Sequence, residues 1–199
     1  ILNPGELFGS FFEDFLHAGD GGVYAEMLSN RALALPLANT SSFRCSGAVG
    51  TGECTWYVEG GTVTRDRSAP LNSAVPNTMW LEPSATATNA GFPGGIAVNA
   101  GDSLTLSLFV NVQGAGRASI EARLVDGMEP AGRVLANTSI TTAQGSEWVR
   151  VVVSLNVKLS SGSDGCRFQL INSAKSTSRI GVTVVSLFPM RTWLGRKNG

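Results

Sequence analysis

The alternating run from Ser103 to Val112 constrains the fold more than any other part of the chain. Its apolar side chains recur at every second position, and the residues between them are mostly polar. The apolar set is Leu104, Leu106, Leu108, Val110 and Val112. Because neighbouring side chains of a strand point to opposite faces, the run predicts a strand with one face in a core and the other in solvent.

The same period returns along most of the chain and predicts further strands. Residues 119–125 place Ile120, Ala122 and Leu124 on one face, and residues 148–159 repeat the pattern. The predicted inward set of the latter is Val149, Val151, Val153, Leu155 and Val157. Shorter or weaker strands are predicted at residues 85–88, 95–98, 133–141, 168–171 and 180–187.

A hairpin is predicted near the start of this region. Residues 55–58 and 62–65 have strand-like composition and flank Gly60-Gly61, which favours a tight turn between paired strands. Roughly eight or nine strands with turns at short intervals and no long helix predict an all-β fold. The simplest such fold is an antiparallel β-sandwich of the jelly-roll type.

Composition agrees with a turn-rich β protein and argues against two classes of partner. Only 15% of the residues are charged, below the roughly 25% of a typical domain, while Gly, Ser and Thr are plentiful. The formal net charge is zero, from 15 basic and 15 acidic residues with no basic stripe, so no nucleic acid partner is expected. No apolar run approaches the roughly 20 residues that span a bilayer, so no membrane partner is expected.

The stretch from Leu7 to Leu33 differs in character from all that follows. Four large apolar residues run into Glu13 and Asp14, then come His17, a Gly-rich turn and a short helical segment. The apolar burst reads as a strand buried on both faces, which is typical of parallel sheets rather than of half-solvated antiparallel ones. A two-faced strand needs covering layers that this stretch alone cannot supply.

Motifs at both ends of the chain resemble the eukaryotic-type α-L-arabinofuranosidases of glycoside hydrolase family 51. These motifs are LFGSFFED at 7–14, HAGDGGVYAEMLSNR at 17–31, VSLFPMRTW at 185–193 and GRKNG at 195–199. The first two motifs resemble the opening strand of the family's (β/α)8 catalytic barrel and the stretch that follows it. The last motif resembles the segment that leads back into the barrel in that family. Between them lies an inserted domain that looks like a carbohydrate-binding module.

The resemblance implies a division of the chain. Residues 1–33 are expected to be a strand-loop-helix segment of the barrel, 34–54 a linker, 55–190 the sandwich, and 191–199 the return toward the barrel. By the same resemblance, Glu13 takes the position of a substrate-binding residue in the barrel subsite. The family's acid/base and nucleophile lie on later strands, so no catalytic residue is expected in this chain, and the Glu-Pro pairs at 82–83 and 129–130 read as loops.

Aromatic side chains are the candidates for sugar contact by the sandwich. Tyr57, Trp80 and Phe92 can stack on sugar rings if they are exposed beside a few polar groups. Each can equally be a core residue, as can Trp56 and Trp148. In the resemblance, Phe92 is followed by Pro93 where the family tends to carry a further aromatic, and Thr183 stands where the family has an Asp.

Cysteines and glycosylation motifs bear on the compartment. Cys45 and Cys54 enclose a short Gly-rich loop that can close as a disulfide, and Cys166 lies in a strand-like run typical of a buried free thiol. Asn39 and Asn137 each begin an Asn-Thr-Ser sequon, which favours a secreted glycoprotein of the extracellular space or cell wall. With a single histidine and dispersed cysteines, neither a zinc site nor a Ser-His-Asp site is expected.

The function expected from the sequence is that of a non-catalytic, carbohydrate-binding-like module of an arabinofuranosidase-like glycoside hydrolase. Its expected partner is an arabinose-containing polysaccharide or the remainder of the barrel, and no cofactor is expected, with a structural calcium ion left open. The alternative is a purely structural sandwich that binds no sugar. A third reading is that the chain is one half of a cleaved enzyme, in which Glu13 completes the subsite.

Overall fold

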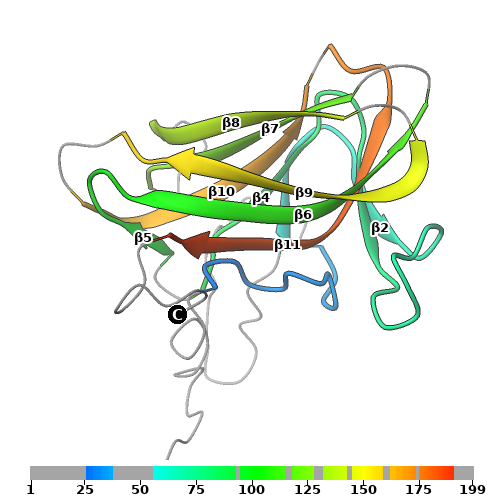
Figure 1. Cartoon of the computed structure of the whole chain (residues 1–199), viewed down its shortest axis with the longest axis horizontal. Coiled ribbons are helices and arrows are strands. Elements are labelled where there is room, and N and C mark those ends of the chain that lie inside the picture. Colours follow the sequence, from blue (N-terminus) through cyan, green and yellow to red (C-terminus); the bar gives the residue numbers. More distant parts are fainter. Residues whose placement is uncertain are drawn as a thin grey trace, which may run out of the picture.

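The computed structural model describes residues 26–37, 56–92, 95–114, 118–127, 132–142, 145–158, 162–173 and 175–190. These residues form eleven strands in two antiparallel sheets, as the sequence predicts for a β-sandwich (Figure 1). The strands are β1 (Trp56–Gly60), β2 (Val63–Asp66), β3 (Thr78–Leu81), β4 (Thr86–Asn89), β5 (Ile96–Val98), β6 (Ser103–Gln113), β7 (Ala118–Val125), β8 (Val134–Thr142), β9 (Gly145–Asn156), β10 (Ser163–Asn172) and β11 (Arg179–Pro189).

The two sheets lie face to face as two layers. One sheet has the order β1-β4-β10-β7-β8, with β5 paired to β10, and the other has the order β2-β3-β11-β6-β9. Figure 1 shows β7, β8 and β10 in one layer and β6, β9 and β11 in the other. Of the described part of the chain, no helix is long and apolar enough to cross a membrane.

β6 has the orientation that its alternation predicts. Leu104, Leu106, Leu108, Val110 and Val112 are all buried, and they belong to the hydrophobic core between the sheets. The strand lies between β11 and β9, so both of its edges are hydrogen-bonded within its sheet. The predicted inward residues of β7, which are Ile120, Ala122 and Leu124, are buried in the same core from the opposite sheet.

The predicted hairpin around Gly60-Gly61 is wrong. β1 pairs with β4 in one sheet, whereas β2 pairs with β3 in the other, so the turn carries the chain between layers. Gly61 has a φ of 66° and lies so close to Ala85 that an added Cβ would be 2.7 Å from its Cα. The two glycines therefore mark a tight crossing at the edge of the sandwich rather than a turn between paired strands.

The prediction that residues 148–159 bury five alternating apolar side chains is confirmed fully only at the C-terminal end of this stretch. Leu155 and Val157 are buried, and Val151 and Val153 are partly buried against the core. Val149, by contrast, is 56% exposed. β9 is the last strand of its sheet and has a neighbouring strand on one side only, so the alternation of its sequence continues at positions that the core does not bury.

Residues 26–37 contain no helix, so the predicted helical segment is wrong over its described part. Asn30 and Leu33 have φ values of 48° and 57°, which right-handed helices do not contain. Leu28 and Leu33 are buried in the same hydrophobic core as the strands. This segment, which spans the predicted boundary at residue 33, therefore packs on the sandwich.

Candidate functional site

The segment 26–37 takes a place beside β11 that β3 leaves open. β3 pairs with β11 only from Ile180 to Val182. Farther along β11, the N–H of Met27 donates to the carbonyl of Leu187 at 2.9 Å, and the N–H of Val185 donates to the carbonyl of Arg31 at 3.0 Å. The segment runs along β11 in Figure 1 and continues the hydrogen bonding of that edge.

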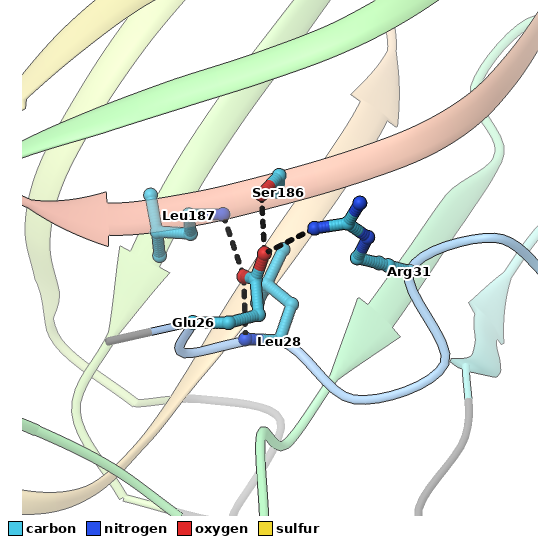
Figure 2. A network of polar contacts seen from close by, with 5 residues as sticks. All are labelled: Glu26, Leu28, Arg31, Ser186 and Leu187. Atoms are coloured by element: carbon cyan, nitrogen blue, oxygen red, sulfur yellow. Dashed lines mark hydrogen bonds and ion pairs between the residues drawn. The ribbon is translucent and has the colours of Figure 1, made fainter. Parts of the chain in front are cut away.

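The carboxylate of Glu26 is the centre of this contact, as Figure 2 shows. Its Oε1 accepts hydrogen bonds from the N–H of Leu28 at 3.1 Å and of Leu187 at 2.9 Å. Its Oε2 accepts a hydrogen bond from the Ser186 hydroxyl and lies 3.7 Å from Nη1 of Arg31. Since Glu26 is only 8% exposed, these partners replace the water that a carboxylate would otherwise hold.

The same segment is also fixed to the six-stranded sheet. Nδ2 of Asn89, at the end of β4, donates to the carbonyl of Ser29 at 2.9 Å, and Oδ1 of Asn89 accepts from the Ser29 hydroxyl at 3.4 Å. From β2, Arg65 donates to the carbonyls of Leu33 at 2.7 Å and Ala34 at 2.8 Å. The segment therefore bridges both sheets at one edge of the sandwich.

A row of polar side chains crosses the outer face of the six-stranded sheet. The strand register places one residue from each of five strands side by side, in the order Tyr57, Thr88, Gln169, Arg123 and Asn137. The neighbouring residues on β7, Ala122 and Leu124, face the core, so Arg123 faces outward. We refer to this set of five residues as the polar row.

Thr88 and Gln169, in the inner half of the polar row, contact a glutamate that belongs to an ion pair. Oε2 of Glu59 on β1 accepts from the Thr88 hydroxyl and from Nε2 of Gln169, the latter at 2.6 Å. Oε1 of Glu59 lies 3.6 Å from Nη2 of Arg167, whose side chain is fully buried, while Glu59 is 12% exposed. Arg167 also donates from Nη1 to the carbonyl of Gly127 at 2.7 Å.

The outer half of the polar row, which consists of Arg123 and Asn137, is open to solvent, as is Glu121 beside it on β7. Arg123 donates to Glu121 in a two-pronged contact, with both distances at 2.7 Å. The two side chains are 35% and 27% exposed, and Asn137 beside them is exposed. The hydrogen bond from Arg123 lowers the pKa of Glu121, although partial burial opposes the shift, so the pair carries both charges at neutral pH.

Two of the three predicted sugar-stacking residues are buried, so the prediction is wrong for them. Trp80 is 0% exposed and Tyr57 is 4% exposed, which leaves neither ring a face for a sugar. Phe92 is half-buried. Trp56 lies in the core in edge-to-face contact with Phe168, and Trp148 is half-buried on β9.

Trp80 is covered by groups that are distant in sequence. The guanidinium of Arg179 on β11 lies over its ring, 4.4 Å from the centroid. Its indole N–H donates to Asp66 on β2 at 3.0 Å. Gly181 leaves room for the ring, because an added Cβ there would be 2.8 Å from Cζ3 of Trp80. Burial here comes from side chains stacked on the outer face of the sheet, not from the core between the sheets.

Asp66 gives the fold a predicted sensitivity to acid. Partial burial alone would raise its pKa, but hydrogen bonds from the Ser68 N–H and hydroxyl, the Trp80 indole and the Arg179 charge together lower it. A carboxylate whose pKa is lowered by folding stabilises the protein above its ordinary pKa, and that stabilisation is lost as pH falls toward the lowered value. Measured by urea unfolding, the free energy of unfolding should fall less with decreasing pH in Asp66→Asn than in the unaltered chain. The exposed Asp164→Asn should behave like the unaltered chain, and equal slopes for all three would contradict the prediction.

The remaining predicted residues divide between described and undescribed parts of the chain. Asn137 is exposed on β8, as glycosylation requires, and Cys166 is a buried free cysteine whose thiol pKa is raised by burial. Glu13, Asn39, Cys45 and Cys54 lie outside the described residues, so their predicted roles stay predictions. Within the described ranges, no group of three or more His, Cys, Asp or Glu side chains is placed to hold a metal ion.

Glu26, Glu59 and Arg167 are the residues that sequence reasoning missed. Glu26 lies within the motif AEMLSNR and Ser186 within VSLFP, so the two motifs at opposite ends of the chain meet in the structure. The sequence offered one signal for this contact, which is that both residues lie in motifs that resemble the same family. Glu59 and Arg167 carry no such signal, because their pairing depends on strand order.

Comparisons with known proteins agree with the motifs. No model of a known protein family matches the chain. The chain is 28% identical over 194 residues to an extracellular exo-α-L-arabinofuranosidase of Streptomyces chartreusis, with 97% of the chain and 21% of the relative covered. It is 28% identical over 205 residues to α-L-arabinofuranosidase 1 of Arabidopsis thaliana, with 96% of the chain and 28% of the relative covered.

A solved structure gives the same result. An arabinose-bound family-51 α-L-arabinofuranosidase superposes with a TM-score of 0.68 at 27% identity, over 94% of this chain and 30% of that one. The chain thus spans less than a third of the length of each of these proteins. Along nearly its whole length the chain is similar to α-L-arabinofuranosidases, one of them of glycoside hydrolase family 51, and it corresponds to one part of their length.

Proposed function

We propose that the chain is the non-catalytic β-sandwich module of a secreted glycoside hydrolase that acts on arabinose-containing cell-wall polysaccharides. The observation that carries the proposal is the similarity to α-L-arabinofuranosidases along nearly the whole chain, which spans less than a third of their length. The catalytic pair is then supplied by the rest of the enzyme. Glu13 would belong to its substrate subsite.

Within this module, the outer half of the polar row, together with Glu121 beside it on β7, is the proposed sugar-binding surface. A few placed polar side chains that donate and accept hydrogen bonds fix the orientation of a bound ligand such as a sugar. Arg123 and Glu121 supply such groups on the exposed face of β7, and Asn137 on β8 adds an amide where its sequon carries no glycan. The ion pair between Arg123 and Glu121 holds both side chains in place, so less side-chain freedom is lost when a ligand binds.

Calorimetric titration with arabinan and arabinoxylan oligosaccharides tests the proposal. Arg123→Ala removes both prongs of the contact with Glu121 and a charged donor for sugar hydroxyls, so we expect binding about tenfold weaker or more. Arg133→Ala is the matched control, because Arg133 is also exposed and pairs with Asp126 away from the polar row. Equal affinity in both variants would exclude the polar row as the site. Hydrolysis of an aryl arabinofuranoside by the purified chain would contradict the non-catalytic assignment.

A purely structural role is the second candidate, and the contact of segment 26–37 with both sheets favours it. A module held this firmly to the segment that precedes it is suited to supporting a neighbouring domain. The burial of Tyr57 and Trp80 also removes two rings that a sugar platform would use. If the unaltered chain fails to bind any of these oligosaccharides at millimolar concentration, the structural role is the one to retain.

A further inference from the structure

The segments through which the described chain begins and ends lie side by side. Ser186 is 160 positions after Glu26, yet its hydroxyl donates to the Glu26 carboxylate. Next to this contact, Met27 and Leu187 are joined through their backbones. On the other edge of β11, the N–H of Met190 donates to the carbonyl of Ser103 at 2.8 Å, so the last described residue is fixed to β6.

The carboxylate of Glu26 does what a neighbouring strand would otherwise do. The N–H of Leu187 points to the side of β11 where a partner strand would present a carbonyl, and Oε1 of Glu26 occupies that position. The same atom accepts from the N–H of Leu28, which bends the segment back toward its own side chain. One buried carboxylate therefore satisfies donors from both the incoming segment and β11.

We propose that Glu26 is a clamp that holds the incoming segment 26–33 against the outgoing part of β11, residues 185–190. Domains joined to a sandwich through both segments would then keep one orientation relative to it, because two connections fixed at one point cannot swing independently. The proposal rests on the proposed function only in taking the attached body to be the rest of the enzyme. Glu26 is a positioning residue here and has no part in chemistry.

Hydrogen exchange of backbone amides in the 199-residue chain tests the clamp, and it requires neither sugar nor activity. In Glu26→Ala, we expect the amides of Met27, Leu28, Val185 and Leu187 to exchange on the order of tenfold faster or more. Amides of β6 and β7 should keep their rates, because Leu28 and Leu33 still hold the core. Glu147→Ala, which removes an exposed glutamate of β9, is the matched control and should leave every rate unchanged.

Two further variants separate the hydrogen bonds from the charge. Glu26→Gln keeps an acceptor of the same length, so it should release the segment less than alanine does, and it serves as the test if Glu26→Ala fails to fold. Arg31→Ala should change the rates less than either, because Arg31 is half-exposed and 3.7 Å from the carboxylate. Unchanged exchange in both Glu26 variants would overturn the proposal, since the leucines would then hold the segment alone. Faster exchange throughout the sandwich would also overturn it, because Glu26 would then be an ordinary stability determinant. Neither result bears on whether sugar binds.

Discussion

Replacing Glu59 with alanine is expected to lower the free energy of unfolding by about 3 to 5 kcal/mol. The substitution removes the charge that faces the fully buried guanidinium of Arg167 and takes an acceptor away from Thr88 and Gln169. Breaking one member of a buried pair costs more than the pair itself contributes, because the other charge stays out of water. Urea unfolding followed by circular dichroism gives the difference directly.

A double variant shows whether the penalty belongs to the buried charge. In Glu59→Leu/Arg167→Met, the charges are replaced together by apolar side chains, so stability should recover in part, although Thr88, Gln169 and the Gly127 carbonyl still lack their partners. Glu147→Ala controls for the loss of a glutamate at an exposed site and should change stability by less than about 0.5 kcal/mol. The interpretation fails if Glu59→Ala is as stable as this control, or if the double variant is less stable than Glu59→Ala.

Strands that cross the centre of a sheet were predictable from the sequence. β6 and β7 face the core with one side, so the alternation of apolar side chains follows burial along most of each strand and is broken near one end, where Asn111 and Val125 are also buried. β3 was missed because all four of its residues are buried, including Thr78 and Trp80. A strand covered on both faces has no alternation, and four residues are too few to distinguish it from a loop.

The pairing partners of the strands were not predictable from the sequence, which is why the predicted hairpin at Gly60-Gly61 was wrong. The two glycines signal a tight change of direction, and their local chemistry does not say whether the next strand stays in the same sheet. The structure uses the turn to cross from β1 to β2 in the other layer. Hydrogen bonding to β4 and β3, which are later in the chain, decides that outcome.

The candidate site depended on the same long-range order. Trp80 is buried because Arg179, near the other end of the described chain, stacks on its ring, and no property of residues near Trp80 predicts this. Glu26 was expected in a helix, where its neighbours three and four positions away would matter. Its partners are instead Ser186 and Leu187 of β11, so its role follows from the sheet edge that it completes.

Replacing Trp56 with alanine is expected to lower the free energy of unfolding by about 3 to 5 kcal/mol, the usual cost of a large aromatic deletion in a core. Trp56 is 0% exposed and lies on β1, with its ring 6.2 Å from that of Phe168 at an interplanar angle of 76°. Alanine would remove this edge-to-face contact and leave a cavity beside Phe168 that the close-packed core cannot fill.

Phenylalanine at the same position separates ring packing from the polar indole group. The indole N–H of Trp56 is buried and has no hydrogen-bond partner among the described residues, so Trp56→Phe loses packing volume but also removes a desolvated donor. We expect this variant to lose no more than about 1 kcal/mol, far less than Trp56→Ala. Trp148→Ala on the edge strand β9 is the control for loss of an indole and should cost less than Trp56→Ala, because Trp148 is half-buried. Equal losses for the phenylalanine and alanine variants would mean that the indole N–H is satisfied and that the polar group, not the ring contact with Phe168, carries the stabilisation.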